Sequence, residues 1–530
     1  MDETHSTGAP SVVLALDEGT TNTKALLVSC ATGEVIASSS RPVGITFPAP
    51  GWVEQDASDL WAATVAAARD CLAGSPDVRV EAVSISNQRE SVVCWDRRDG
   101  TPLGPVLGWQ DARTALWCAQ LAGEHPDAEP LVRSRTGLTL DPMYSAPKMR
   151  ALWDAALAGG ADPADIALGT VDSWLVWNLT GEHLAEIGNA SRTLLLDLAT
   201  CTWDAELLDL FGIPRSALGE LRGSDAGFGR TSTRTLLPTG VPVQAVLADS
   251  HAAMYHHGCD RPGTGKATYG TGSSVMAPVA AASAAPDGIT TTVAWHTDGS
   301  PTYAREGNII ASGAALDWMA ATLGARPGAT DGAFLTELAA TVPDSGGVSF
   351  VPAFSGLGAP YWDRAATGIL VGVTAGTTRA HLARAALEAV AHQVSDVVDA
   401  IEADGAARID VLRADGGATR SRLLMQTQAD LLGRVVQVAD APEASALGAA
   451  TLARRALGHS PGPTGDQVQL VPSSTDPAPA RRAWHAAVGR SRTQDSRDAP
   501  APAPVRERPA PTRAPVAPRT RLLAPPIGDD

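Results

Sequence analysis

The sequence predicts an α/β protein built from two similar halves with a cleft between them. At 530 residues the chain exceeds the size of a single core, so at least two domains are expected. An apolar strand at 12–16 runs into a polar turn at the start of the chain, and an apolar strand at 243–248 meets Asp249 in the middle. A further strand at 265–269 then meets another turn of glycines and hydroxyls. This restart predicts a duplicated architecture with its boundary near residue 255.

Short strands and amphipathic helices are expected in both halves. The first three strands are separated only by turns, so they predict a meander rather than a strand–helix–strand unit: 12–17, 24–30 and 34–40. Apolar spacing near 3.6 residues predicts a helix over 57–73 and a longer one over 379–402, which ends at Asp404 and Gly405. Other expected elements are strands at 81–86 and 92–96 and helices across much of 112–160.

Composition favours a globular protein of the cytoplasm. Hydrophobic residues make up 44% of the chain and charged residues 19%, and no apolar run is long enough to span a membrane. The acidic N-terminus lacks the features of a secretion signal, and the six cysteines are scattered, as expected of reduced thiols. A net charge of −17 argues against a nucleic-acid partner.

Three regions are predicted from these patterns. The first domain covers residues 1–254 and the second 255–490. Residues 491–530 are rich in proline, alanine and arginine without periodicity, and this composition predicts a disordered tail.

The stretch ALDEGTTNTK, Ala15 to Lys24, has two interpretations. It is a β-hairpin in which Gly19 lets the chain reverse, or it is a phosphate-binding turn. In the second case, backbone N–H groups and small hydroxyls hold phosphate oxygens while Asp17 holds a magnesium ion.

Similar glycine–hydroxyl turns recur at 268–274 and 415–421. One such turn is weak support for a site, but three in both halves favour one extended phosphate ligand between the domains. Asp249 is then either a helix cap or a carboxylate that faces Asp17. Facing carboxylates would divide the work, one on the metal and one taking a hydroxyl proton.

Two other patterns are decoys. GTGKAT at 263–268 lacks the first glycine and the Ser or Thr of a phosphate-binding P-loop. His251, His256 and His257 have no carboxylate or cysteine nearby in the sequence at ligand spacing, so no metal site is predicted there.

Several collinear stretches resemble the FGGY family of carbohydrate kinases, and the glycerol kinases within it most closely. They include GWVEQD (51–56), ISNQRES (85–91), TGLTLDPMYSAPK (136–148), NASRT (189–193), TYGTGSS (268–274), FSGLGAPYWD (354–363) and DGGATRSRLLMQ (415–426). Residues 368–388 carry the family's C-terminal signature. The resemblance runs from about residue 12 to about residue 489. It implies two actin-like (ribonuclease H-like) domains, with a nucleotide cleft between them, that close over ATP and a small polyol or sugar.

The resemblance also implies roles for individual residues. Asp249 matches the catalytic base, which takes the proton of the accepting primary hydroxyl, and Asp17 matches the residue that serves Mg²⁺. The positions that match acceptor-binding residues are Arg89, Glu90, Trp109, Met143, Asp249, Ser250 and Ser274. The positions that match ATP-binding residues are Thr20, Thr21, Asn22, Lys24, Thr271, Gly313, Asp317, Gly417 and Ser421.

Five of these positions depart from the glycerol kinase pattern. Lys24 stands in place of an arginine, which keeps the charge and loses the bidentate fork, and Asp317 stands in place of a glutamine. In the acceptor site, Met143, Ser250 and Ser274 replace a tyrosine, a glutamine and a phenylalanine. These changes open space, so the acceptor is either glycerol, with neighbours such as Tyr144 or His251 filling the gap, or a larger polyol or ketose of four or five carbons.

Two further interpretations stay open at this stage. An actin-like protein that hydrolyses ATP without a small acceptor would not need the set Arg89, Glu90 and Trp109, which favours a kinase. The changes at Asp317 and Ser250 leave open a catalytically weak regulatory protein that binds ATP. Relatives are often dimers or tetramers, so the resemblance is compatible with a homo-oligomer.

Overall fold

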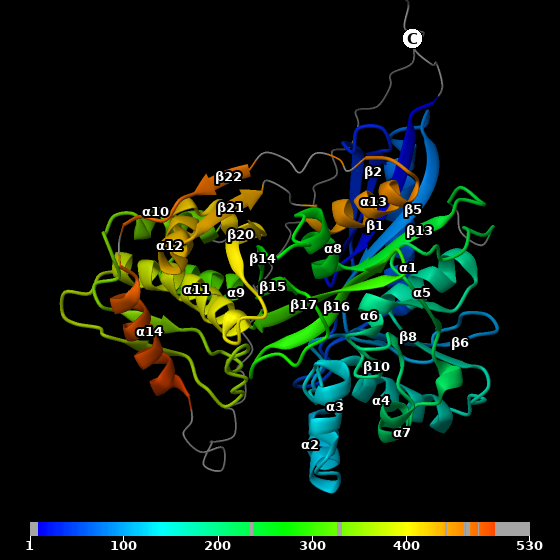
Figure 1. Cartoon of the computed structure of the whole chain (residues 1–530), viewed down its shortest axis with the longest axis horizontal. Helices are drawn as coiled ribbons and strands as arrows, with labels where there is room; N and C mark the ends of the chain where they lie inside the picture. The colour runs from blue at the N-terminus through cyan, green and yellow to red at the C-terminus, as the bar shows by residue number, and fades with distance from the viewer. Residues whose placement is uncertain are drawn as a thin grey trace, which may run out of the picture.

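Two α/β halves lie side by side in the computed structural model of the chain (Figure 1). The structure describes residues 9–233, 237–325, 331–439, 443–460, 462, 467–474 and 476–492. The tail predicted at 491–530 lies outside the described residues apart from its first two.

The first half is built on a five-stranded sheet in the order β13–β5–β1–β2–β3. Strands β1, β2 and β3 form the predicted antiparallel meander, while β5 and β13 run parallel to β1. The carboxyl ends of β1, β5 and β13 therefore meet at one edge of the sheet. The strands are β1 (Ser11–Glu18), β2 (Asn22–Ser29), β3 (Val35–Pro42), β5 (Arg79–Asn87) and β13 (Val243–Ala248).

The second half contains a seven-stranded sheet whose five central strands have the same arrangement, read from the opposite edge. Its central strands run β17–β15–β14–β20–β21, with the same antiparallel and parallel senses, while β16 and β22 extend the two edges. The predicted duplication is therefore present in the topology. The strands are β14 (Gly263–Tyr269), β15 (Ser273–Val279), β16 (Thr290–Thr297), β17 (Ser300–Ile309), β20 (Ile409–Asp415), β21 (Val435–Ala439) and β22 (Gln467–Leu470).

Smaller sheets complete the strand set. The first half also contains an antiparallel four-stranded sheet in the order β4–β7–β6–β8. Its strands are β4 (Glu54–Gln55), β7 (Val106–Leu107), β6 (Val92–Asp96) and β8 (Ile166–Thr170). The strand pairs are β9 (Leu184–Glu186) with β12 (Glu220–Arg222), β10 (Leu196–Asp197) with β11 (Thr202–Trp203), and β18 (Ser349–Val351) with β19 (Ile369–Val371).

Helices cover the sheets, and the two predicted from periodicity have the expected bounds. Helix α1 (Ala57–Ala73) is capped by the Asp56 carboxylate, which accepts from the backbone N–H groups of Ser58 and Asp59. The other helices of the first half are α2 (Ala115–Glu124), α3 (Ala128–Thr136), α4 (Ser145–Ala158), α5 (Val171–Thr180), α6 (Ile187–Ala190), α7 (Ala205–Phe211), the 3₁₀ turn η1 (Arg215–Ala217) and α8 (Asp249–His256).

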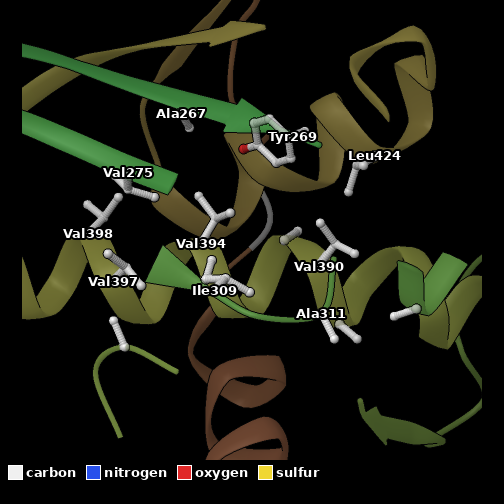
Figure 2. Packing of buried hydrophobic residues seen from close by; sticks show 14 of the residues in the cluster. Ala267, Tyr269, Val275, Ile309, Ala311, Val390, Val394, Val397, Val398 and Leu424 are labelled. Atoms are coloured by element: carbon white, nitrogen blue, oxygen red, sulfur yellow. The ribbon is translucent and has the colours of Figure 1, made fainter. Parts of the chain in front are cut away.

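In the second half, α11 (Arg379–Glu402) contributes more buried core residues than any other helix. Figure 2 shows its valines, among them Val390, Val394 and Val397, packed toward Val275 of β15 and Ile309 of β17. The other helices are α9 (Gly313–Thr322), α10 (Asp331–Ala339), η2 (Gly417–Arg420), α12 (Arg422–Leu432), α13 (Ala444–Ala456) and α14 (Ala478–Ser491). No helix in the described part of the chain has both the length and the hydropathy needed to cross a membrane.

Helix α13 belongs to the second half in sequence but packs on the first. It lies against α8 and the strands β1, β5 and β13 (Figure 1). Ala446 and Ala450 of α13 share one buried cluster with Ala245 of β13 and Ala252 of α8. The same cluster takes in Trp295 of β16. The halves therefore meet through a shared apolar core, beside the edge where β1, β5 and β13 end.

Candidate active site

Two carboxylates lie where the parallel strands of the first sheet end. Asp17 is the next-to-last residue of strand β1, and Asp249 follows β13 directly as the first residue of α8. Asn87, at the end of β5, is the register partner of both Glu18 and Ala248. Burial raises the pKa of Asp17 to about 6, and the nearby charge of Asp249 adds to this rise. The two carboxylates are therefore close enough for the charge of one to act on the other, which agrees with the second of the two interpretations of Asp249.

The turn between β1 and β2 is the predicted hairpin. The N–H of Gly19 donates to the carbonyl of Asn22 at 3.0 Å, and a side chain at Gly19 would press on that same oxygen. The Asn22 amide donates to the Thr21 hydroxyl at 3.2 Å. The Trp109 indole N–H donates to the Thr20 hydroxyl at 3.1 Å, although the two residues come from distant loops. This contact joins the predicted phosphate-binding turn to Trp109, which is predicted to bind the acceptor.

Arg89 and Glu90 follow β5 and are buried, so they are not a solvated surface pair. The Arg89 guanidinium lies 2.7 Å from the Glu306 carboxylate and 3.4 Å from the Asp249 carboxylate. Arg192 donates from Nε to the Glu90 carboxylate at 2.7 Å and lies 3.0 Å from Glu306. Five charged groups from four segments, Asp249 among them, thus form one connected network.

Asp249 is the member of this network that reaches solvent. Its side chain is 39% exposed, whereas those of Arg89 and Glu306 are 9% and 0% exposed. The backbone N–H of Ser250 donates to its carboxylate at 2.6 Å. The surrounding protein nonetheless desolvates this carboxyl and raises its pKa, and the Arg89 guanidinium only partly opposes that rise. A carboxylate that is exposed and has a raised pKa is suited to accept a proton.

Lys266 and Ser274 approach the same place from the second half. Lys266 lies on β14, is fully buried and directs its ammonium group toward the Ser274 hydroxyl on β15 at 3.5 Å. Asp249 is among the charges that act on Lys266. The GTGKAT stretch is thus part of a strand and not a P-loop, as predicted.

Met143 and Tyr144 occupy different environments. The Met143 side chain is half-buried against an apolar cluster, while its carbonyl accepts from the buried ammonium of Lys148. Tyr144 is fully buried, and the Arg192 guanidinium lies over its ring at 5.2 Å from the centroid. Of the two neighbours, Tyr144 is the one that contacts the charged network.

The residues predicted to hold the nucleotide fall on neighbouring turns of the second half. The carbonyl of Thr271, in the β14–β15 turn, accepts from Ser312 N–H at 3.0 Å. A side chain at Gly313 would lie 2.5 Å from the Gly270 carbonyl oxygen, so only glycine fits there. Asp317 lies one turn further along α9.

The third glycine–hydroxyl turn follows β20. Gly417 begins η2, and the Ser421 hydroxyl caps α12 and accepts from the Thr336 hydroxyl at 2.8 Å. Because β14 and β20 are parallel neighbours, this turn and the β14–β15 turn lie at the same sheet edge.

Comparison with known proteins identifies the family. The model of the N-terminal domain of the FGGY family of carbohydrate kinases matches residues 12–255, and that of the C-terminal domain matches residues 265–457. The chain belongs to this family. The resemblance inferred from its motifs is confirmed.

Individual FGGY relatives cover nearly the whole chain. A glycerol kinase of Geobacter sp. (strain M21) is 44% identical over 448 residues, which are 83% of this chain and 89% of the relative. An apulose kinase of Pectobacterium atrosepticum is 44% identical over 496 residues, 91% of this chain and 98% of the relative. The solved structure of Plasmodium falciparum glycerol kinase with ADP is 27% identical with a TM-score of 0.84, and covers 92% of this chain and 100% of that one.

These FGGY matches establish the fold and the class of reaction. The chain has the two-domain, actin-like fold of the family with its ATP cleft. It is a glycerol-kinase-like enzyme that uses ATP as phosphoryl donor and an alcohol group of a small polyol or sugar as acceptor. The interpretation as a phosphotransferase is therefore confirmed.

Two site residues were missed by sequence reasoning, Arg192 and Glu306. Both are partners of predicted residues but lie 102 and 217 positions away from them. A usable signal was present in each case. Arg192 is the only charge in the NASRT stretch, and Glu306, next to Arg305, is the only acidic residue of β17.

The histidines at 251–257 form no metal cluster among the described residues. His257 instead bonds to the carboxylate of Asp415, at 2.6 Å, a partner too distant in sequence to be expected. The one set of potential ligands that the described residues bring together is Cys30, Glu81 and His459, and none of them belongs to the acceptor or nucleotide residues.

Proposed function

We propose that this FGGY kinase transfers the γ-phosphoryl group of ATP to a primary hydroxyl of its acceptor with Asp249 as the general base. The observation that carries this proposal is the position of Asp249, solvent-accessible yet held 3.4 Å from Arg89 at the edge where β1, β5 and β13 end. A general base must lie within reach of the hydroxyl it serves and bind a proton readily, and both conditions favour Asp249.

In the proposed reaction the acceptor oxygen attacks the γ-phosphorus while its proton passes to the Asp249 carboxylate. The new O–P bond forms as the bond between the γ-phosphorus and the β–γ bridging oxygen breaks, and ADP leaves. Arg89, Glu90 and Trp109 hold the other hydroxyls so that one oxygen points at the phosphorus. Such alignment accounts for much of the rate enhancement in phosphoryl transfer.

The residues present fit a magnesium ion bound with ATP. Asp17 and Asp249 offer the hard oxygen ligands that Mg²⁺ prefers, and both lie at the edge of the sheet where β1 and β13 end. When bound, the ion neutralises charge on the phosphates. We infer that Asp17 holds it, while Thr20, Thr21, Asn22 and Lys24 contact the phosphates.

The rest of the nucleotide is proposed to lie on the second half. Thr271 and Gly417 are exposed, Gly313 begins α9 and Ser421 caps α12, so these residues lie at turns and helix starts on one side of the second sheet, which suits binding of the nucleoside part. Asp317 lies one helical turn from Gly313 and so is kept in this set.

Two acceptors are supported by different observations. Glycerol is supported by the glycerol kinase relatives and by the pair Arg89 and Glu90. A larger sugar is supported by the apulose kinase relative, which this chain matches over 98% of its length, and by the small side chains Ser250 and Ser274. Met143 is proposed to line the acceptor site together with these serines.

The experiment that tests the function is ADP release with Mg-ATP across glycerol, erythritol, threitol, erythrulose, xylitol, ribulose, xylulose, apulose and gluconate. Acceptor-dependent turnover supports the kinase, and the best acceptor separates the two candidates. Silence throughout would contradict the proposal and favour a regulatory ATP-binding protein.

We also propose a cytoplasmic location, where ATP is available to such a kinase, and no nucleic-acid partner, because the net charge is −17. We propose the domain boundary between residues 254 and 255 of the sequence. Helix α13 follows this boundary in the sequence but packs on the first half.

A further inference from the structure

A cysteine, a glutamate and a histidine from distant parts of the chain meet at the edge of the first sheet where β1 and β5 begin. They are Cys30, Glu81 and His459, and each offers one ligand atom within 4.8 Å of those of the other two. None of them belongs to the candidate active site. Thiolate sulfur, imidazole nitrogen and carboxylate oxygen together form a donor set that suits Zn²⁺, whereas Mg²⁺ prefers oxygen alone.

Local structure holds each of the three residues in place. The Cys30 backbone N–H donates to the carbonyl of the first residue of β1 at 2.9 Å, and Glu81 is the third residue of β5. The N–H of His459, just after α13, donates to the Arg454 carbonyl at 2.9 Å. Gly458 has a φ of 86°, the left-handed conformation with which a chain commonly leaves a helix. Each ligand therefore stands on defined backbone structure.

The separation of Glu81 and His459 fits two ligands of one ion better than a direct bond. Glu81 Oε2 and His459 Nε2 lie 3.8 Å apart, which is longer than a hydrogen bond. Two ligands of a tetrahedral Zn²⁺ are about 3.3–3.6 Å apart, because each lies about 2.0–2.3 Å from the ion. Small side-chain rotations would therefore bring the three ligand atoms to coordination distance.

A metal ion can reach this place from solvent. The side chains of Glu81 and His459 are 23% and 35% exposed, so an ion meets them first. Cys30 is buried and closes the inner side of the cluster. As its sulfur binds the ion, the thiol proton leaves to solvent. The thiolate and the carboxylate then balance the two positive charges of Zn²⁺.

Two arginines lie beside the cluster. Arg79 pairs with Oε1 of Glu81, which leaves Oε2 for the ion, and Arg454 donates to the Cys30 carbonyl at 3.1 Å. Their positive charges favour the thiolate form of Cys30. They also repel a cation, but the Arg79 side chain is 67% exposed, so water and salt screen much of its effect.

We propose that Cys30, Glu81 and His459 bind one Zn²⁺ ion, with water as the fourth ligand, at a structural site that holds α13 on the first sheet. Glu81 and Asn87 are six residues apart on β5, so the site lies about 20 Å from the sheet edge that carries the candidate active site. The ion therefore has no part in phosphoryl transfer. It joins the end of α13 to the strands on which that helix packs (Figure 1).

The test is zinc uptake by the full chain after a chelator has removed bound metal, in an excess of Mg²⁺ that keeps hard oxygen sites occupied. We expect one equivalent of Zn²⁺ per chain in competition with a chromophoric chelator, and a higher unfolding temperature with the metal than without it. Co²⁺ in place of Zn²⁺ should give the near-ultraviolet absorption of a sulfur–cobalt bond and the visible bands of a tetrahedral site.

Cys30→Ser and His459→Ala should each weaken zinc binding by about 100-fold or more, because a direct ligand matters more than a residue that supports one. Both should remove the rise in unfolding temperature. His459→Ala changes a partly exposed side chain, so it keeps the test decisive if Cys30→Ser does not fold. The matched controls are Cys71→Ser, at a buried free cysteine of α1, and His125→Ala, at the exposed histidine that ends α2. Both controls should leave zinc binding unchanged.

Three results would overturn the zinc site. The first is equal zinc binding by the wild type and both ligand variants, and the second is a cobalt spectrum without the sulfur band. The third is no zinc uptake at all, in which case Cys30 is a packed thiol, and Glu81 with His459 a surface pair of little energetic value. None of these results bears on the proposed kinase function, which acceptor-dependent ADP release tests separately.

Discussion

At the scale of single residues, the site depends on how Arg89 is shared. Its guanidinium lies between the carboxylates of Asp249 and Glu306, and Glu306 is the more buried of the two. Desolvation raises the pKa of Asp249, and Arg89, whose charge is shared with the more buried Glu306, only partly opposes that rise, so Asp249 stays basic. A lone arginine at this distance would lower that pKa and weaken the base.

Replacement of the base is the direct test of this arrangement. Asp249→Asn keeps the size of the side chain and removes its ability to take a proton. We expect kcat to fall by about 10³-fold or more, because both the proton acceptor and its charge are lost. Calorimetric titration should show the dissociation constant for ADP within about threefold of the wild type, since a lost nucleotide site is not expected. Unchanged turnover would exclude Asp249 as the base.

Glu306, the buried partner of Arg89, should contribute to the free energy of unfolding. Glu306→Gln leaves Arg89 and Arg192 facing an uncharged group in a fully buried position, at a cost of about 3 kcal/mol in the free energy of unfolding. Glu206→Gln is the matched control, because its 62% exposed carboxylate pairs with Arg135 at the surface and should cost less than about 0.5 kcal/mol. Urea unfolding of both variants measures the difference, and equal costs would contradict the buried network.

The ion pairs of Glu306 with Arg89 and Arg192 predict that the stability of the fold depends on pH. Burial alone would raise the pKa of Glu306, but Arg192 and Arg89 hold it well below its ordinary value. Since the folded pKa is lowered, the stabilisation is complete above the unfolded value of about 4.3 and is lost as pH falls below it. The stability difference between the wild type and Glu306→Gln should therefore shrink by about 1.4 kcal/mol for each pH unit below about 4. A difference that grows on acidification would contradict this sign.

At the scale of elements, the placement of Asp249 depends on helices α8 and α13. A Cβ at Gly448 of α13 would overlap the backbone carbonyl of Ala252 on α8. Only glycine lets the two helices approach this closely, and α8 carries Asp249 at its start. The stretch SALGAA (445–450), which contains Gly448, therefore has a packing role next to the candidate site.

Gly448→Ala should separate these two helices. Alanine favours a helix by about 1 kcal/mol, but the clash is with backbone and costs more, so we expect a net loss of about 1–3 kcal/mol and roughly tenfold lower kcat/KM. Gly489→Ala on α14 is the control, because nothing lies within 4 Å of the added carbon, and it should gain about 0.5–1 kcal/mol. Chemical unfolding measures the change in stability of the two variants, and steady-state kinetics measures the change in kcat/KM. Stabilisation of both would show that α8 and α13 adjust freely.

Elements with a strong local pattern could be predicted from the sequence. Helices α1 and α11 have the predicted bounds because their apolar spacing and caps are local, and the β1–β3 meander follows from its short turns. The short strand pairs β9–β12 and β10–β11 were not predicted, because two or three residues carry no periodicity. The packing of α13 against the first sheet was also not predicted. The small residues of α13 indicate that another element approaches it closely, but they do not indicate which element that is.

At the scale of the whole molecule, the site is assembled from both halves and many loops. The positions of Asp17, Arg89 and Asp249 at the strand ends could be predicted, because each lies at or within two residues of the end of a strand and inside a recognisable motif; their roles remain predictions. Arg192 and Glu306 could not be predicted, because a contact between an ion and its partner 100 or 200 residues away depends on tertiary folding alone. The same holds for the bond between Trp109 and Thr20, which joins two regions that sequence analysis treated separately.

One ion pair joins the two halves at the phosphate turn. Lys24 on β2 lies 2.8 Å from the carboxylate of Glu443, which precedes α13, and both side chains are about one-third exposed. Sequence analysis assigned Lys24 to the phosphates of ATP. If both assignments hold, the phosphates and Glu443 compete for one ammonium group, because a single cation cannot be fully bonded to both.

Competition for Lys24 predicts opposite effects of two neutral variants. Glu443→Gln should release Lys24 and lower KM for ATP about two- to fivefold, whereas Lys24→Gln should raise it about tenfold through loss of a charge-assisted bond. The double variant should behave like Lys24→Gln, since Glu443 acts only through the lysine. Steady-state kinetics at saturating acceptor measures all three. A rise in KM for Glu443→Gln would mean instead that the ion pair holds α13 and the phosphate turn in register, and that Lys24 has a positioning role between the halves.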